Sequence, residues 1–129
     1  MLKISHRDLK PSNILIFPDW KIKVSDYGIS SQIDKSGKDE ITRCGTVMFA
    51  APEVMGSARG ARVLPFASDI YSLGLIACWM MIKGMPDVLE IYSHEIEFPD
   101  VYSRELQEFV YFCLVRLPQD RPNISQVHE

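Results

Sequence analysis

The chain has 129 residues, of which 47% are hydrophobic and 24% charged, and its net charge is −3. A chain of this length and composition can bury one core, so we expect a single soluble globular domain rather than a disordered protein. The small negative charge gives no electrostatic reason to expect nucleic acid or an anionic membrane as a partner.

The cysteines and the apolar runs of the sequence indicate in which cellular compartment the protein is expected. Cys44, Cys78 and Cys113 lie far apart, with no His or Cys at metal-ligand spacing, which favours reduced thiols over a disulfide framework or a zinc site. No secretory signal begins the sequence, and the longest apolar run, residues 73–82, is too short to cross a bilayer. We therefore expect an intracellular, cytoplasmic protein without a membrane span, in which this run is a buried core helix.

The first elements expected along the chain form a β-hairpin. Residues 13–17 and 21–24 are rich in β-branched and aromatic side chains, and the Pro-Asp-Trp sequence between them is typical of a tight turn. Residues 30–43 are polar and are expected to form a loop, as are residues 54–68 with their glycines and arginines.

Helices are expected from residue 69 onward. Asp69 is a candidate cap for a helix over residues 70–83, which the following glycine ends. Ser103 begins the next helix, whose apolar side chains recur at helical spacing before Pro118, and Asn123 is a candidate cap for a last helix. The pattern predicts a mainly α (α+β) fold, with a small hairpin and loop layer packed on a helical body.

Three short motifs follow one another in this framework. Residues 6–13 have the sequence HRDLKPSN, residues 26–28 are Asp-Tyr-Gly, and residues 51–53 are Ala-Pro-Glu. Any one of them could occur by chance in an ordinary loop or turn. The ordered set, with strand patterns between the first two, resembles the catalytic loop, the metal-binding turn and the end of the activation segment of a eukaryotic protein kinase catalytic domain.

The resemblance implies the C-terminal lobe of the kinase fold, as a partial kinase domain over residues 1–129. Residues 6–13 would be the catalytic loop, 26–53 the activation segment and 69–83 helix F. The Gly-rich loop, strand lysine and helix C glutamate of the N-terminal lobe, which the family uses on ATP, have no counterpart in the sequence. The isolated chain is therefore expected to be inactive, and without helices D and E its helix F is expected to expose apolar surface.

The resemblance also assigns chemistry to four residues. Asp8 would orient and deprotonate the substrate hydroxyl, and Lys10 would stabilise charge on the phosphoryl group as it moves. Asn13 and Asp26 would be the Mg²⁺ ligands, because carboxylate and carbonyl oxygens suit that hard cation. With Lys10 they would hold the two cofactors of the family, ATP and Mg²⁺.

Further family positions are implied to support the site. His6 and Arg7 would brace the catalytic loop, and Arg7 would also reach a phosphate in the activation segment. Asp69 resembles the helix F aspartate that accepts backbone N–H groups of the catalytic loop. Glu53 and Arg121 resemble the buried pair that joins the activation segment to the last helices; without the motifs, solvated surface charges would be the better interpretation.

Three positions in the predicted activation segment have regulatory or structural roles by the same resemblance. Gly28 completes the metal-binding turn, and Thr46 is expected to hydrogen-bond Asp8 and Lys10. Thr42 is the expected site of activating phosphorylation, since a phosphate there would come within reach of the catalytic-loop arginine. An ordinary loop threonine is the alternative at this position.

The leading prediction is an ATP- and Mg²⁺-dependent serine/threonine protein kinase. Lys10 and the Gly45-Thr46 pair are typical of that class, and Tyr27 in place of the usual Phe indicates the tyrosine-kinase-like group. The expected partners are a protein substrate, ATP and upstream regulatory domains. The alternative is a catalytically inactive, kinase-derived fragment that acts as a protein-binding or scaffold module; the retained catalytic and metal-binding residue types argue against it, and the missing ATP-holding residues argue for it.

Overall fold

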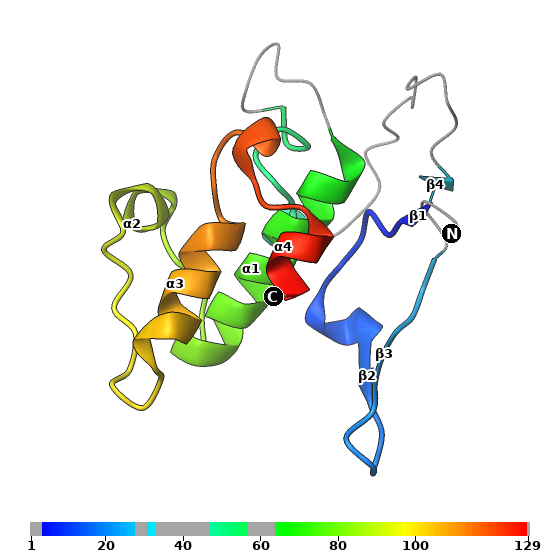
Figure 1. Ribbon diagram of the computed structural model, residues 1–129, viewed down its shortest axis with the longest axis horizontal. Coiled ribbons are helices and arrows are strands. Elements are labelled where there is room, and N and C mark those ends of the chain that lie inside the picture. The colour runs from blue at the N-terminus through cyan, green and yellow to red at the C-terminus, as the bar shows by residue number, and fades with distance from the viewer. Residues whose placement is uncertain (1–3, 28–30, 33–46, 57–63, 129) are drawn as a thin grey trace.

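The computed structural model describes residues 4–27, 31–32, 47–56 and 64–128 (Figure 1). Apart from Ser31–Gln32, the loop predicted for residues 30–43 lies outside these ranges, as does the middle of the segment 54–68. The described residues form a mainly helical body with two small antiparallel sheets beside it. This confirms the predicted fold class.

The predicted hairpin is present. β2 (Ile14–Ile16) pairs with β3 (Ile22–Val24) in an antiparallel register that sets Ile14 opposite Val24 and Ile16 opposite Ile22. Asn13 was predicted to begin the strand, but it belongs to a short 3₁₀ helix, η1 (Pro11–Asn13). Proline favours the first position of a helical turn, because its φ is fixed and its missing N–H is not needed there.

A second pair of strands was not predicted. β1 (Ile4–Ser5) pairs antiparallel with β4 (Ser31–Gln32). Strands of two residues show no alternation of apolar and polar side chains, so periodicity could not reveal them. Their pairing joins the segment before the first motif to the segment after the second.

The longest helix, α1 (Pro65–Ile82), runs through the middle of the body. The prediction that Asp69 caps this helix was wrong, as was the prediction that residues 65–68 form a loop. Leu64 is the N-cap, in an extended conformation, and Pro65 is the first helical residue. The helix ends at Ile82, and its C-cap is Lys83, which has a left-handed backbone (φ 55°) and lies one residue before the predicted glycine.

α1 packs against α3 (Arg104–Cys113), which was predicted from its periodicity. Ser103 caps α3 as expected, accepting the N–H of Leu106 at 3.3 Å. The helix stops at Cys113 instead of continuing toward Pro118, which begins a 3₁₀ turn, η3 (Pro118–Asp120).

Two short helices complete the body. α4 (Ile124–His128) begins after Asn123 as predicted, and the Asn123 Oδ1 accepts two N–H groups of its first turn at 3.0 and 3.1 Å. α2 (Val88–Ser93) was not predicted. Its signal was present in the sequence, because Asp87 and Glu90 form a capping box: each side chain accepts a backbone N–H, at 2.7 and 2.9 Å.

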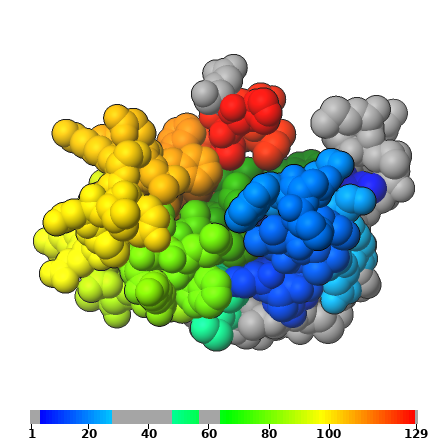
Figure 2. Space-filling model, turned by 90° about the horizontal axis from the view of Figure 1, so that it is seen from below, coloured from blue at the N-terminus to red at the C-terminus, as the bar shows by residue number. Residues whose placement is uncertain are grey.

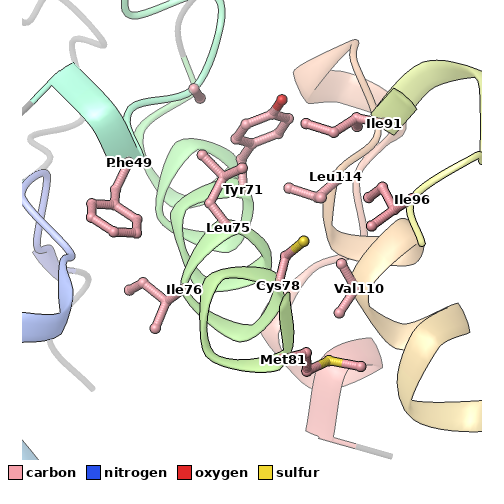
Figure 3. Close-up of a cluster of buried hydrophobic side chains, with 11 residues drawn as sticks. Phe49, Tyr71, Leu75, Ile76, Cys78, Met81, Ile91, Ile96, Val110 and Leu114 are labelled. Carbon is pink, nitrogen blue, oxygen red and sulfur yellow. The ribbon is translucent and has the colours of Figure 1, made fainter. Parts of the chain in front are cut away.

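The hydrophobic core surrounds α1 on two sides (Figure 3). Phe49 approaches one side of the helix, while Val110 and Leu114 meet the other side. Cys78 and Cys113 are buried free thiols, and burial raises the pKa of each to about 11, so both are poor nucleophiles. Cys44 lies outside the described residues.

α1 also reaches the surface. Figure 2 shows it exposed between the N-terminal hairpin and the segment around residue 100, and large apolar side chains lie on it, Met80 being 61% exposed. By length and composition alone α1 could cross a membrane, with a mean hydropathy of 1.4 over 18 residues, so the apolar stretch is longer than the run noted in the sequence. Half of this window is buried against the rest of the chain, as in the core helix of a globular fold.

Candidate active site

The first motif is attached to α1 through Asp69. One carboxylate oxygen of Asp69 accepts the backbone N–H of His6 at 2.8 Å and the hydroxyl of Ser5 at 2.8 Å, and the other accepts the N–H of Arg7 at 2.9 Å. Arg7 has a φ of 68°, an unfavourable conformation for a residue with a side chain. The hydrogen bonds to Asp69 hold the loop in this strained shape.

His6 joins this loop to the residue that precedes the second motif. The ring is buried, its Nε2 lies 2.8 Å from the carbonyl oxygen of Ser25, and its Nδ1 lies 3.2 Å from the backbone nitrogen of Asp8. Since the Asp8 N–H can only donate, Nδ1 accepts and Nε2 carries the hydrogen that goes to Ser25. The neutral imidazole thus connects the segments around Asp8 and Asp26.

Asp8, Lys10 and Asn13 gather on the same loop. The ammonium of Lys10 lies 3.2 Å from a carboxylate oxygen of Asp8, and both side chains are partly exposed. The side-chain nitrogen of Asn13 donates to the backbone carbonyl of Asp8 at 2.8 Å. Because this bond uses the amide nitrogen, the carbonyl oxygen of the buried Asn13 side chain is the atom that a cation would bind.

The hairpin explains how residue 26 comes beside this loop. At its open end the N–H of Ser25 donates to the carbonyl of Asn13 at 2.8 Å, so Asp26 follows directly after a residue bound to Asn13. Asp26 has a φ of 63°, a left-handed conformation that Asp tolerates better than most residues. The pairing of β2 with β3 therefore brings two oxygen-bearing side chains, far apart in sequence, to one end of the hairpin.

The donor set fits a magnesium ion. Asn13 and Asp26 offer a carbonyl and a carboxylate oxygen, and Mg²⁺ in proteins is usually held by one or two such groups together with water and substrate phosphates. Within residues 4–27, 31–32, 47–56 and 64–128, no group of three His, Cys, Asp or Glu side chains could form an all-protein metal site. A cation held with a phosphate ligand suits this site better than a permanently bound metal.

Tyr27, the aromatic residue of the second motif, is 57% exposed and packs on the ring of His6. Its ring centroid lies 4.9 Å from that of His6, at an interplanar angle of 59°. The contact adds a side-chain link between the first two motifs. Three other predicted positions, Gly28, Thr42 and Thr46, lie outside the described residues.

The third motif is attached to the last part of the chain by a buried ion pair. Both guanidinium end nitrogens of Arg121 meet the carboxylate of Glu53, each at 2.7 Å. The other donors of Arg121 go to the carbonyls of Val115, Ala67 and Arg116 at 2.6, 3.1 and 2.9 Å. Burial acts to raise the pKa of Glu53, but the hydrogen bonds from Arg121 and the protein backbone outweigh it and hold that pKa below its usual value.

The sequence did not point to two serines that bind the segment carrying the third motif. Ser68 donates to a Glu53 oxygen at 2.8 Å and Ser72 donates to the carbonyl of Phe49 at 2.6 Å, and both serines are buried. A signal existed: the two serines are four residues apart in a mostly apolar helix and therefore share one face. Polar side chains repeated on one face of a core helix need buried partners.

Comparison with known proteins gives a consistent result. Residues 1–129 match the family model described as "Protein kinase domain". The chain is 33% identical over 132 residues to serine/threonine-protein kinase PLK4 of Xenopus laevis, with 96% of this chain and 14% of that protein covered. It is 34% identical over 139 residues to CBL-interacting protein kinase 15 of Oryza sativa subsp. japonica, with 98% and 31% covered. It is 34% identical over 145 residues to dual specificity protein kinase TTK of Mus musculus, with 96% and 17% covered. The chain thus spans less than a third of the length of these relatives.

Proposed function

The chain belongs to the protein kinase family, and we propose that it supplies the catalytic-loop half of an ATP- and Mg²⁺-dependent protein serine/threonine kinase. The observation that carries the proposal is the arrangement of Asp8, Lys10 and Asn13 on one loop that Asp69 holds against the core helix. In phosphoryl transfer the protein itself does little covalent chemistry. Its main contribution is to hold charged and polar groups in fixed positions around the reacting oxygen. The retained residue types meet that need.

The proposed roles follow from the contacts. Asp8 accepts a hydrogen bond from the attacking hydroxyl and takes its proton, and Lys10, 3.2 Å away, places a positive charge beside the developing negative charge. Asn13 and Asp26 would hold Mg²⁺, which when bound neutralises phosphate charge. His6 fixes the spacing between the two halves of the site, because its ring bonds to a backbone atom on each side.

The experiment is the substitution Asp8→Asn in the complete protein, assayed for phosphate transfer to serine-, threonine- and tyrosine-containing peptides. We expect kcat to fall by on the order of 10² or more, because a positioned base is lost. Asp19→Asn, on the exposed hairpin turn, is the matched control and should leave kcat unchanged. Unchanged kcat in Asp8→Asn would remove the proposal, and transfer to tyrosine alone would remove its serine/threonine part.

One observation favours the alternative of a protein-binding module. Ile16 and Ile22 lie opposite one another on the hairpin and are 64% and 66% exposed, which is unusual for large aliphatic side chains on a sheet. The two functions differ in their need for nucleotide. Titration of the complete protein with ATP and Mg²⁺ should give saturable binding that Asp26→Ala weakens if the protein is an enzyme, and no binding if it is only a module.

A further inference from the structure

The first half of α1 binds two segments of the proposed site, residues 5–7 and residues 49–53. Asp69 holds residues 5–7 through two backbone N–H groups. Ser68 and Ser72, on the same stretch of helix, hold the segment of residues 49–53. A single rigid helix therefore sets where the loop carrying Asp8 lies relative to the segment that ends in the third motif.

The Ser72 hydroxyl donates its hydrogen bond to the segment of residues 49–53 and not to its own helix. Its oxygen lies 2.6 Å from the carbonyl oxygen of Phe49 and 3.2 Å from that of Ser68, one turn back in α1. A hydroxyl has one proton, and in a helix the carbonyl four residues back is its ordinary partner. The shorter distance assigns the proton to Phe49. Ser72 and Phe49 are both buried, so loss of the bond would leave the carbonyl with no other donor among the described residues.

Ser68 shows the same preference one turn earlier. Its oxygen lies 2.8 Å from a carboxylate oxygen of Glu53 and 3.2 Å from the carbonyl of Leu64. This is the Glu53 oxygen that also accepts from Arg121 at 2.7 Å. Ser68 thus helps to orient a carboxylate that already has its ionic partner, whereas Ser72 supplies the bond at the other end of the segment.

We propose that Ser72, supported by Ser68, is a positioning residue for the protein substrate. The inference rests on the proposed kinase function, in which a substrate lies along the end of the activation segment and presents its hydroxyl to Asp8. That geometry requires a fixed distance between the loop that carries Asp8 and the segment of residues 49–53, because small displacements of a reacting group greatly lower the reaction rate. ATP does not depend on this separation, because Lys10, Asn13 and Asp26, the residues of this chain proposed to hold ATP and Mg²⁺, lie on the loop of residues 6–13 and directly after the hairpin.

The kinetic test is Ser72→Ala in the complete protein. We expect kcat/KM for a serine-containing peptide to fall about tenfold, the change typical for loss of one buried hydrogen bond. The KM for ATP and the rate of ATP hydrolysis without peptide should stay within about twofold, a split that a general loss of structure would not produce. Ser72→Thr keeps the hydroxyl and should recover most of the loss. Ser93→Ala, which removes an exposed serine hydroxyl that lies 2.7 Å from a carboxylate oxygen of Glu95 and 2.8 Å from the carbonyl of Leu89, is the matched control.

A second measurement does not depend on activity. The N–H groups of Val54 and Met55 bond to the carbonyl of Ala51 at 3.0 and 3.3 Å, so their hydrogen exchange reports on the tethered segment. Exchange at these two amides should be faster in Ser72→Ala, while the amides of α1 keep their wild-type rates. If Asp8→Asn showed that the protein is no kinase, this measurement would still decide whether Ser72 holds the segment. Unchanged exchange at the two amides, or equal losses of peptide phosphorylation and ATP hydrolysis, would overturn the inference.

Discussion

Arg121 uses its whole guanidinium group inside the protein. Its donors reach the carboxylate of Glu53 and three backbone carbonyls, and its central carbon lies 4.7 Å from the ring centroid of Tyr71. A planar fork of donors can satisfy so many acceptors at once, and a lysine ammonium cannot. A buried charge of this kind is tolerated because nearly every lone pair and hydrogen around it has a partner.

The first prediction compares the two partners. Glu53→Ala should lower the free energy of unfolding by roughly 3–5 kcal/mol, because it leaves a buried guanidinium without its counter-ion. Arg121→Ala should cost more, since the carbonyls of Val115, Ala67 and Arg116 lose their donor as well. The double variant should be little worse than Arg121→Ala, as chemical denaturation of all four proteins would show. Additive losses would mean that the two side chains do not act as a pair.

The pair also predicts a dependence on pH. The pKa of Glu53 is lower in the folded protein than its ordinary value of 4.5, so folding favours the ionised carboxylate. Its contribution to stability is therefore complete above about pH 5 and is lost as the pH falls below 4.5 toward the folded-state pKa. Glu53→Gln lacks this titration, so the stability difference between wild type and Glu53→Gln should shrink between pH 6 and pH 3. A difference independent of pH would contradict this origin of the stability.

At the scale of elements, the contact of α1 with α3 depends on the absence of a side chain at Gly74. A Cβ atom there would lie 2.7 Å from the Cβ of Cys113 and 2.9 Å from a methyl carbon of Leu114. The Leu114 methyl can shift, but the Cβ of Cys113 is fixed to the α3 backbone and cannot move without the helix. The close approach of the two helices is what lets Cys78, Val110 and Leu114 share one core.

Gly74→Ala should therefore destabilise the protein even though alanine favours helix. The overlap is expected to cost roughly 1–3 kcal/mol beyond the gain of about 1 kcal/mol in helix propensity. Gly84→Ala is the control, because a Cβ there would meet nothing within 4 Å and should be neutral or slightly stabilising. Thermal unfolding of the two variants would decide the point, and equal midpoints would show that α1 and α3 adjust freely.

Elements with local signals could be predicted, and those made by tertiary contacts could not. The hairpin and α3 were found because their side chains repeat at the right spacing, and α4 because Asn123 is a good cap. The start of α1 was misplaced, since Asp69 satisfies the pattern of a cap while its carboxylate in fact binds the loop of residues 5–7. The motifs identified the charged residues of the candidate site. The hydrogen bonds of Ser68 and Ser72 could not be predicted, because they depend on a segment that only the tertiary structure brings beside the helix.

At the scale of the whole molecule, the exposed apolar side chains of the hairpin are the feature that needs a partner. Ile16 and Ile22 face each other across β2 and β3, and a two-stranded hairpin without cover is only marginally stable in water. Met80 on α1 is similarly exposed. Under the proposed function, we expect this surface to be covered in the complete protein, and we expect the 129 residues alone to be unable to phosphorylate a peptide.

The last prediction tests whether the exposed hairpin isoleucines are covered in the complete protein, by comparing matched variants. The isolated chain should self-associate with rising concentration, because exposed apolar patches associate in water. The double variant Ile16→Thr/Ile22→Thr keeps β-branched side chains in the strands and should reduce this association in sedimentation experiments. Ile124→Thr, which changes an isoleucine of similar exposure (63%) on α4, should not reduce this association.

In the complete protein the hairpin variant should instead lose stability, by roughly 1–3 kcal/mol for each side chain that the rest of the protein buries. Equal stability of the variant and the wild-type complete protein would mean that the hairpin stays in solvent there too, which favours its use as a docking surface for another protein.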